Sequence, residues 1–196
     1  MFYTLFSGVP IASAWEITIR LAYANGSTNS ITFSDHPILF LLIFPVISML
    51  QGVHFYFIHR LLHWPPLYKY VHSIHHRNVN VGPWSGMSMH PFEHLLWLSS
   101  MGMFLFIPAH PVHIIFLLHW QMLGAPSSHS GYEAVFVKDK SRIFCGGFFH
   151  QLHHRYFECN YGSVEFPLDK WFGTFHDGTE KQTKITRDRK KIMHAK

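Results

Sequence analysis

An uncharged stretch of 22 residues, Pro37–Ile58 (PILFLLIFPVISMLQGVHFYFI), decides the fold class. It is rich in Leu, Ile and Phe, and about 20 such residues are enough to cross the hydrocarbon core of a bilayer. A buried helix of a soluble protein is the alternative, but apolar runs in such helices are usually shorter. The stretch therefore predicts a transmembrane helix.

A weaker apolar segment, Phe2–Ala24, precedes this helix. Glu16 and Arg20 interrupt it, but residues four apart can pair on one helix face. The segment is therefore expected either to span the membrane or to lie in its interface. Asn25–Ser30 is rich in turn-forming residues and is predicted to be the loop between the two segments.

A third apolar segment, residues 92–124, contains a single charged residue, Glu93. Pro108 and Pro111 near its middle should break any helix. Each remaining arm has roughly 15 residues and a length of about 22 Å, which is short for a full span. We therefore predict a helical hairpin that dips into the membrane.

Composition and charge exclude several classes of protein. Only 14% of the 196 residues are charged and 48% are hydrophobic, which excludes a disordered chain. Two cysteines exclude a disulfide framework and a cysteine-based zinc module. Twelve of the 16 Lys and Arg residues follow residue 125, a segregation that argues against a nucleic-acid-binding protein. It is typical of a membrane protein with a cytoplasmic C-terminus.

Histidine is the chemical anomaly, with 18 residues in the chain. His59 and His63 are four residues apart, so a helix would place both on one face. The pattern His-x-x-His-His then occurs twice, and its offsets also share one helical face. The two copies are His72, His75, His76 and His150, His153, His154. Packing alone does not explain such a repeat, which predicts a metal site with more than one ion.

Two isolated histidines, His90 and His129, flank the 92–124 hairpin and are further candidate ligands. Glu93 and Glu133 are candidates for orienting the imidazoles, or else they are charges at helix N-termini. Ten candidate ligands exceed the capacity of one ion, so two ions are expected. Imidazole-rich sites suit iron, copper, zinc or nickel, and spacing alone does not choose between them.

Topology is a check on this interpretation. The histidine motifs lie on both sides of residues 92–124, so a single crossing would put them on opposite faces of the membrane. A hairpin returns them to one face. The basic C-terminus then places the histidines in the cytoplasm.

Six segments carry a resemblance to a known family: His59–His63, Tyr68–His76, Met89–Glu93, Ser128–Glu133, His150–Phe157 and Asn160–Gly162. They resemble the fatty acid hydroxylase/sterol desaturase superfamily of integral-membrane di-iron enzymes. Within it, they are similar to C4-methylsterol oxidases and sterol C5-desaturases. The resemblance covers residues 37–177.

The resemblance implies an all-α, multi-pass membrane protein with about four transmembrane or membrane-embedded helices under a cytoplasmic, histidine-rich helical cap. It implies two iron ions, O₂ as co-substrate, and electrons from cytochrome b5 or another small carrier with its reductase. It also makes His90 and His129 expected members of the metal site. Residues 1–36 would form an N-terminal membrane segment and loop, residues 37–177 the catalytic domain, and residues 178–196 a solvated basic cytoplasmic tail.

The expected function is O₂-dependent hydroxylation or desaturation of a lipid C–H bond. On resemblance, a sterol-like substrate is the first choice and a fatty acyl or alkyl lipid the second. The membrane would be the endoplasmic reticulum in a eukaryote and the inner membrane in a bacterium. The alternative is a histidine-rich membrane metal transporter or metal-binding protein without oxidase activity. A transporter would place ionisable residues within its spans, whereas here the patterned histidines lie outside the apolar runs.

Overall fold

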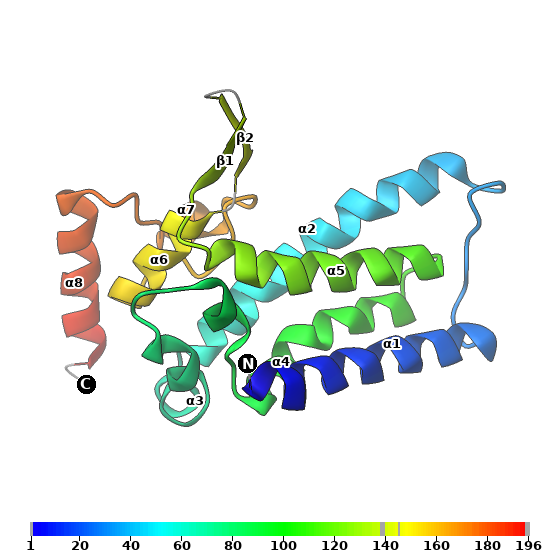
Figure 1. Cartoon of the computed structure of the whole chain (residues 1–196), viewed down its shortest axis with the longest axis horizontal. Coiled ribbons are helices and arrows are strands. Elements are labelled where there is room, and N and C mark those ends of the chain that lie inside the picture. Colours follow the sequence, from blue (N-terminus) through cyan, green and yellow to red (C-terminus); the bar gives the residue numbers. More distant parts are fainter. Residues whose placement is uncertain (1, 138–139, 145, 195–196) are drawn as a thin grey trace.

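Four long helical segments run side by side in the computed structural model, which describes residues 2–137, 140–144 and 146–194 (Figure 1). They are α1 (Val9–Ala24), preceded by the π-helical turn η1 (Thr4–Gly8); α2 (Pro37–Leu62); α4 (Pro91–Leu98), continued by the 3₁₀ helix η4 (Ser99–Leu105); and α5 (Pro111–Ser128). The predicted proline break separates η4 from α5, so the 92–124 segment is a helical hairpin.

The loops that join these helices meet at one end of the bundle. The Ile31 amide in the α1–α2 loop donates to the Ala109 carbonyl in the η4–α5 turn, at 3.4 Å. Figure 1 shows both connections at the end opposite the smaller helices. Chain segments on both sides of the hairpin therefore return to the same end of the bundle.

Helix α2 is the dominant element of the bundle. Its 26 residues correspond to a length of about 39 Å. Proline at its first position suits a helix start, because the missing N–H would have had no partner there. Within the described part of the chain, it is the one helix long and apolar enough to cross a membrane, and only 22% of its most apolar window is buried.

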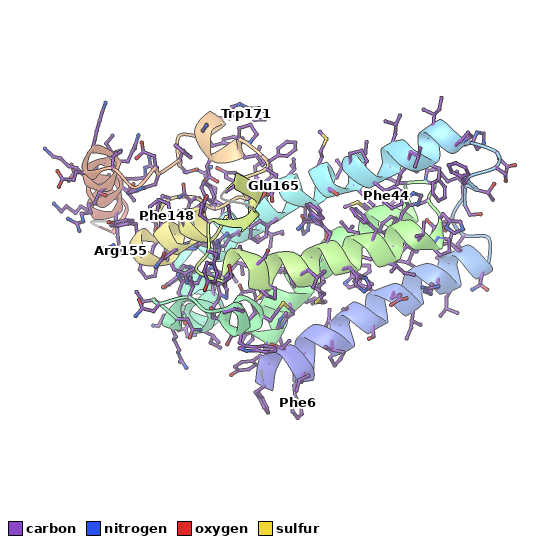
Figure 2. The ribbon with its side chains drawn as sticks, turned by 45° about the horizontal axis from the view of Figure 1, so that its top comes forward. Phe6, Phe44, Phe148, Arg155, Glu165 and Trp171 are labelled. Carbon is purple, nitrogen blue, oxygen red and sulfur yellow. The ribbon has the colours of Figure 1, made fainter. Side chains whose placement is uncertain are left out.

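Apolar side chains lie both inside and outside the bundle. Its core includes fully buried Ile47, Leu98, Met101, Phe104, Ile114 and Leu117. Large apolar side chains also cover the outer surface, among them Phe6, Ile17, Leu21, Ile38, Leu42 and Leu123. Figure 2 shows Phe6 pointing away from the bundle. An apolar exterior of this extent marks a surface that contacts lipid or another apolar partner.

Short helices form a cap at the other end of the bundle. They are α3 (Pro65–Tyr70), η2 (His72–Arg77), η3 (Pro83–Met87), α6 (Gly147–Tyr156), α7 (Leu168–Trp171) and α8 (Glu180–His194). The predicted helical class is confirmed for the bulk of the chain. Strands β1 (Ala134–Val137) and β2 (Lys140–Phe144) form an antiparallel hairpin that the sequence did not predict.

The C-terminal segment, expected to be a solvated basic tail, is largely helical. Residues Glu180–His194 form helix α8, which packs against α6. Arg189 ties it to the cap by donating to the Glu158 carbonyl, at 3.1 Å. The segment lacks a broad apolar stripe because polar contacts hold much of its inner face, so an apolar-periodicity criterion overlooks the helix.

Candidate metal centre

Nine histidines converge in two adjacent groups inside the cap. Cluster A consists of His59, His63, His72, His76 and His153, and cluster B of His75, His129, His150 and His154. Within each cluster the ligand nitrogens lie within 4.8 Å of one another. The clusters adjoin, since the ring centroids of His76 and His154 are 4.5 Å apart. All nine are buried except His63, which is partly buried.

Each His-x-x-His-His motif contributes to both clusters. From the first motif, His72 and His76 belong to cluster A and His75 to cluster B. The second motif is divided in the opposite sense, with His150 and His154 in cluster B and His153 in cluster A. In each motif, the two residues four apart share one site and the residue between them turns to the other. Each copy of the repeat therefore supplies ligands to both sites.

Six pairs of imidazole Nε2 atoms lie 3.1 Å apart. In cluster A, the Nε2 atom of His72 is 3.1 Å from those of His59 and His76, and the Nε2 atom of His153 is 3.1 Å from those of His63 and His76. In cluster B, the Nε2 atom of His154 is 3.1 Å from those of His129 and His150. The nitrogens therefore surround two common points.

Four of the nine rings also direct their opposite nitrogen, Nδ1, to an acceptor. His59 Nδ1 donates to the Tyr161 carbonyl at 2.7 Å, and His153 Nδ1 to the Cys159 carbonyl at 2.6 Å. His72 Nδ1 donates to Glu93 Oε1 at 2.7 Å, and His129 Nδ1 to the Ala125 carbonyl at 2.8 Å. These contacts place the proton on Nδ1 and leave the Nε2 lone pair directed into the cluster, the usual arrangement of metal-binding histidine.

These contacts explain why the clusters favour a bound cation. His59 and His72 both carry their proton on Nδ1, so no proton lies between their Nε2 atoms, and two lone pairs face each other at 3.1 Å. Burial lowers the pKa of His154 to about 3 and holds the pKa of His72 and His153 well below the usual 6.5. The rings are therefore neutral at pH 7, and a bound cation is what relieves the repulsion.

The separations also bear on the coordination geometry. Two nitrogens about 2.1 Å from one ion lie about 3.0 Å apart at a right angle and about 3.4 Å apart at the tetrahedral angle. The observed 3.1 Å is close to the right-angle value. Cluster A also offers five nitrogens, one more than a tetrahedral ion uses. The donor set fits ions of higher coordination number, such as iron, better than structural zinc.

The two candidate glutamates occupy different positions. Glu93 is 2% exposed and accepts the Nδ1 proton of His72, as an orienting carboxylate does. Glu133 is exposed and accepts from the Phe148 amide at 2.8 Å, at the start of α6. Its charge therefore stabilises the N-terminus of the helix that carries His150, His153 and His154.

His90 lies outside both clusters. Its Nδ1 accepts from the Phe92 amide at 3.1 Å and so caps α4. We expect His90→Ala to retain the full metal content and to lower stability by about 1 kcal/mol, the usual effect of losing a helix cap. Elemental analysis and thermal unfolding of the purified variant test this, and loss of one metal ion would identify His90 as a ligand.

The sequence patterns did not indicate Asp169, which supports two ligands of cluster A indirectly. Its Oδ1 accepts from the Tyr161 amide at 2.9 Å, and its Oδ2 from the Gly162 amide at 2.8 Å. These bonds fix the turn whose Cys159 and Tyr161 carbonyls hold His153 and His59. Its only signal in the sequence was its position shortly after the Asn160–Gly162 segment.

We expect Asp169→Ala to destabilise the cap by about 3 kcal/mol, because it leaves several buried donors without their charged acceptor. It should also lower the metal occupancy of cluster A, since the two carbonyls lose their support. Thermal unfolding and metal content measure both effects. Asp188→Ala, which removes an exposed carboxylate paired with Lys191, is the control and should change neither.

An apolar cavity of about 580 Å³ reaches both clusters. His59 and His72 of cluster A and His75, His129 and His150 of cluster B lie in its wall. Its remaining lining comes largely from the bundle and includes Phe55, Met89, Trp97, Phe116, Trp120 and Leu123. Trp120 and Leu123 are also exposed on the bundle surface, so the cavity extends from that surface to the histidines.

Comparison with known proteins decides the family. The profile of the fatty acid hydroxylase family matches residues 44–174, about two thirds of the chain. The chain belongs to the fatty acid hydroxylase family. The match includes every histidine of clusters A and B, and the predicted resemblance is confirmed. No solved structure shows a significant match to this family member.

Sterol-modifying enzymes are among the relatives of this fatty acid hydroxylase family member. Methylsterol monooxygenase erg25A of Aspergillus fumigatus is 33% identical over 74% of the chain and 50% of its own length. Methylsterol monooxygenase 1 of Gallus gallus is 31% identical over 65% of the chain and 44% of its own length. Delta(7)-sterol 5(6)-desaturase ERG3B of Gibberella zeae is 31% identical over 61% of the chain and 37% of its own length. The chain spans about half the length or less of these relatives.

Proposed function

We propose that the protein is an O₂-dependent, non-haem di-iron enzyme that hydroxylates or desaturates a C–H bond of a membrane lipid. The observation that carries this proposal is the apolar cavity that ends on two clusters of buried, neutral imidazoles. A sterol-like substrate is favoured, because the relatives described above are named for sterol monooxygenation and desaturation. A fatty acyl or alkyl lipid is the second choice.

The cavity suits a lipid in size and polarity. Its volume of about 580 Å³ lies within the range of about 300–1,000 Å³ that is typical of small-molecule sites. Aromatic and Met side chains form much of its wall, and the imidazoles are among its polar groups, together with Gln51, Gln121 and Glu165. Apolar walls exclude water and orient a rigid apolar substrate with one carbon toward the histidines.

Clusters A and B would each hold one iron ion, with their nine imidazoles as ligands. When bound, iron supplies the redox chemistry that activates O₂ and attacks an unactivated C–H bond. Hydroxylation places one oxygen atom of O₂ in the substrate and reduces the other to water with two electrons and two protons. Desaturation removes two substrate hydrogens and forms two waters with the same two electrons and two protons.

The chain's own residues orient the imidazoles and exclude water from the site. Backbone carbonyls hold His59 and His153, and Glu93 holds His72, with the Nε2 lone pair inward. Burial keeps the rings neutral. The electrons would come from cytochrome b5 or another small carrier and its reductase. Together these features support an oxygenase site that receives a lipid from one side and electrons from another.

We further propose that the four helical segments are embedded in the membrane, with the cap and the C-terminus in the cytoplasm. The apolar exterior of the bundle supports this, as do the two connections at its end opposite the histidines. The basic residues that follow residue 125 give the orientation. The membrane would be the endoplasmic reticulum in a eukaryote or the inner membrane in a bacterium.

The test combines metal analysis with lipid profiling. Purified protein should contain about two iron ions per chain, and cells that express it should accumulate a hydroxylated or desaturated lipid only when O₂ is present. In the alternative, a metal transporter or metal-binding protein, metal would be bound and lipids would be unchanged. The grouping of the patterned histidines in the cap, rather than along the bundle, favours the enzyme.

A further inference from the structure

A basic surface covers the cap on the side of α8. Helix α8 contains six Lys and Arg residues and two acids. Lys184, Arg187 and Lys190 recur every three residues, so they lie on neighbouring positions of one side of the helix, and all three are exposed. Exposed Arg155, near the end of α6, extends this surface from α8 onto α6 (Figure 2). We call these four residues the basic face.

Three of the four cations of the basic face are packed on aromatic rings rather than on carboxylates. The guanidinium groups of Arg155 and Arg187 lie 5.5 and 6.0 Å from the centre of the same ring, Tyr156. Lys190 Nζ lies 4.5 Å from the centre of the Phe157 ring. Among the described residues, none of these cations forms an ion pair. Positive charge is therefore concentrated and left available to an acidic partner.

The basic face adjoins cluster A through one aromatic ring. Phe157, beneath Lys190, stacks on the ligand His76 with centroids 4.9 Å apart and planes 25° apart. Phe157 has φ of 70° and ψ of −53°, a conformation that is strained for a residue other than glycine. The cap therefore holds this ring in a strained position between the surface cations and a metal ligand.

The position of α8 favours a soluble partner over a lipid surface as the ligand of the basic face. Figure 1 shows α8 at the end of the molecule opposite the α1–α2 loop, on the outer side of the cap. If the bundle spans the membrane, the basic face lies on the part of the cap farthest from the lipid headgroups. A basic helix that bound anionic lipid would instead lie at the junction of bundle and cap.

We propose that the basic face is the docking site for a small, acidic one-electron carrier protein, and that electrons reach cluster A beside Phe157 and His76. The proposal rests on the proposed function, which requires two electrons per turnover. Each docking oxidises the carrier by one electron and reduces the metal centre by the same electron, so two dockings serve one turnover. Complementary charge would steer the carrier and fix its orientation.

The primary test is direct binding, which does not depend on catalysis. The probe is the acidic, soluble haem domain of cytochrome b5, titrated against the full chain in detergent at low ionic strength. The triple variant Lys184→Glu/Arg187→Glu/Lys190→Glu should weaken binding at least about tenfold, as expected for loss of electrostatic steering. The difference should shrink as salt is added. The matched control Lys184→Arg/Arg187→Lys/Lys190→Arg keeps the charge and should bind like wild type.

A second measurement separates this proposal from the proposed function. Dithionite, a small reductant, should reduce the bound iron equally in all three proteins. The reduced haem domain should reduce it more slowly in the charge-reversal variant than in the other two proteins. Failure of dithionite to reduce any of them would count against the di-iron function and leave the binding result to decide the docking site. Equal affinity of wild type and charge-reversal variant for the haem domain would overturn the docking proposal.

Vesicles test the lipid-surface alternative. Wild type and the charge-reversal variant are compared for binding to phosphatidylcholine vesicles with and without phosphatidylserine. Under the docking proposal, phosphatidylserine makes no difference between them. If the charge reversal abolishes binding to phosphatidylserine vesicles while the haem domain binds both proteins equally, α8 is a membrane contact and the proposal is wrong.

Discussion

Replacement of His153 by alanine is expected to abolish the proposed lipid oxidation and to remove about one of the two iron ions that we propose for the centre. His153 is fully buried, and its Nε2 atom is 3.1 Å from those of both His63 and His76, so it joins two other donors of cluster A. The Cys159 carbonyl fixes the His153 ring, so the alanine variant loses a donor that is held in position in cluster A. Elemental analysis and turnover per chain measure the two effects.

Two further variants show whether the effect is specific. His75→Ala should remove about one iron from cluster B and also abolish turnover, because the proposed reaction uses both ions. His36→Ala is the control: His36 is exposed and precedes the first residue of α2, whereas His59 lies near the other end of that helix. Mild and equal losses in all three variants would show that the histidines are not a catalytic metal centre.

Local spacing explains why the candidate metal site could be foreseen from the sequence. Histidines three or four residues apart share a helical face, so each motif had to present its rings together. The proline break at Pro108–Pro111 then required the chain to return, which brought the distant motifs to one end of the bundle. Both inferences use interactions within a few residues, for which sequence patterns are informative.

The division of the histidines between two clusters could not be foreseen. The first motif forms a 3₁₀ helix, His72–Arg77, and the second lies on the α-helix α6. The identical spacing therefore hides two backbone geometries, and the distribution of the rings depends on how the two helices face each other. Asp169 escaped notice for a similar reason, because its role rests on contacts with a turn that tertiary structure brings to it.

His129 depends on another long-range contact, which involves Gly86. This glycine lies in η3, and α5 passes directly against its Cα. A methyl group at this position would overlap the Ala125 carbonyl and lie 2.9 Å from His129 Nδ1. These two atoms form the 2.8 Å hydrogen bond that orients His129. Only a residue without a side chain allows η3 and that hydrogen bond to coexist.

Gly86→Ala is therefore expected to displace His129 and to deplete cluster B of iron while cluster A stays filled. The added methyl meets backbone rather than a flexible side chain, so we expect a loss of stability of about 1–3 kcal/mol, as for overpacked cores. Iron content should fall toward about one ion per chain, and turnover should be lost. Gly82→Ala is the matched control, because a methyl group four residues earlier meets nothing within 4 Å. Retention of both ions in Gly86→Ala, with unchanged thermal unfolding, would show that His129 does not need this hydrogen bond to complete cluster B.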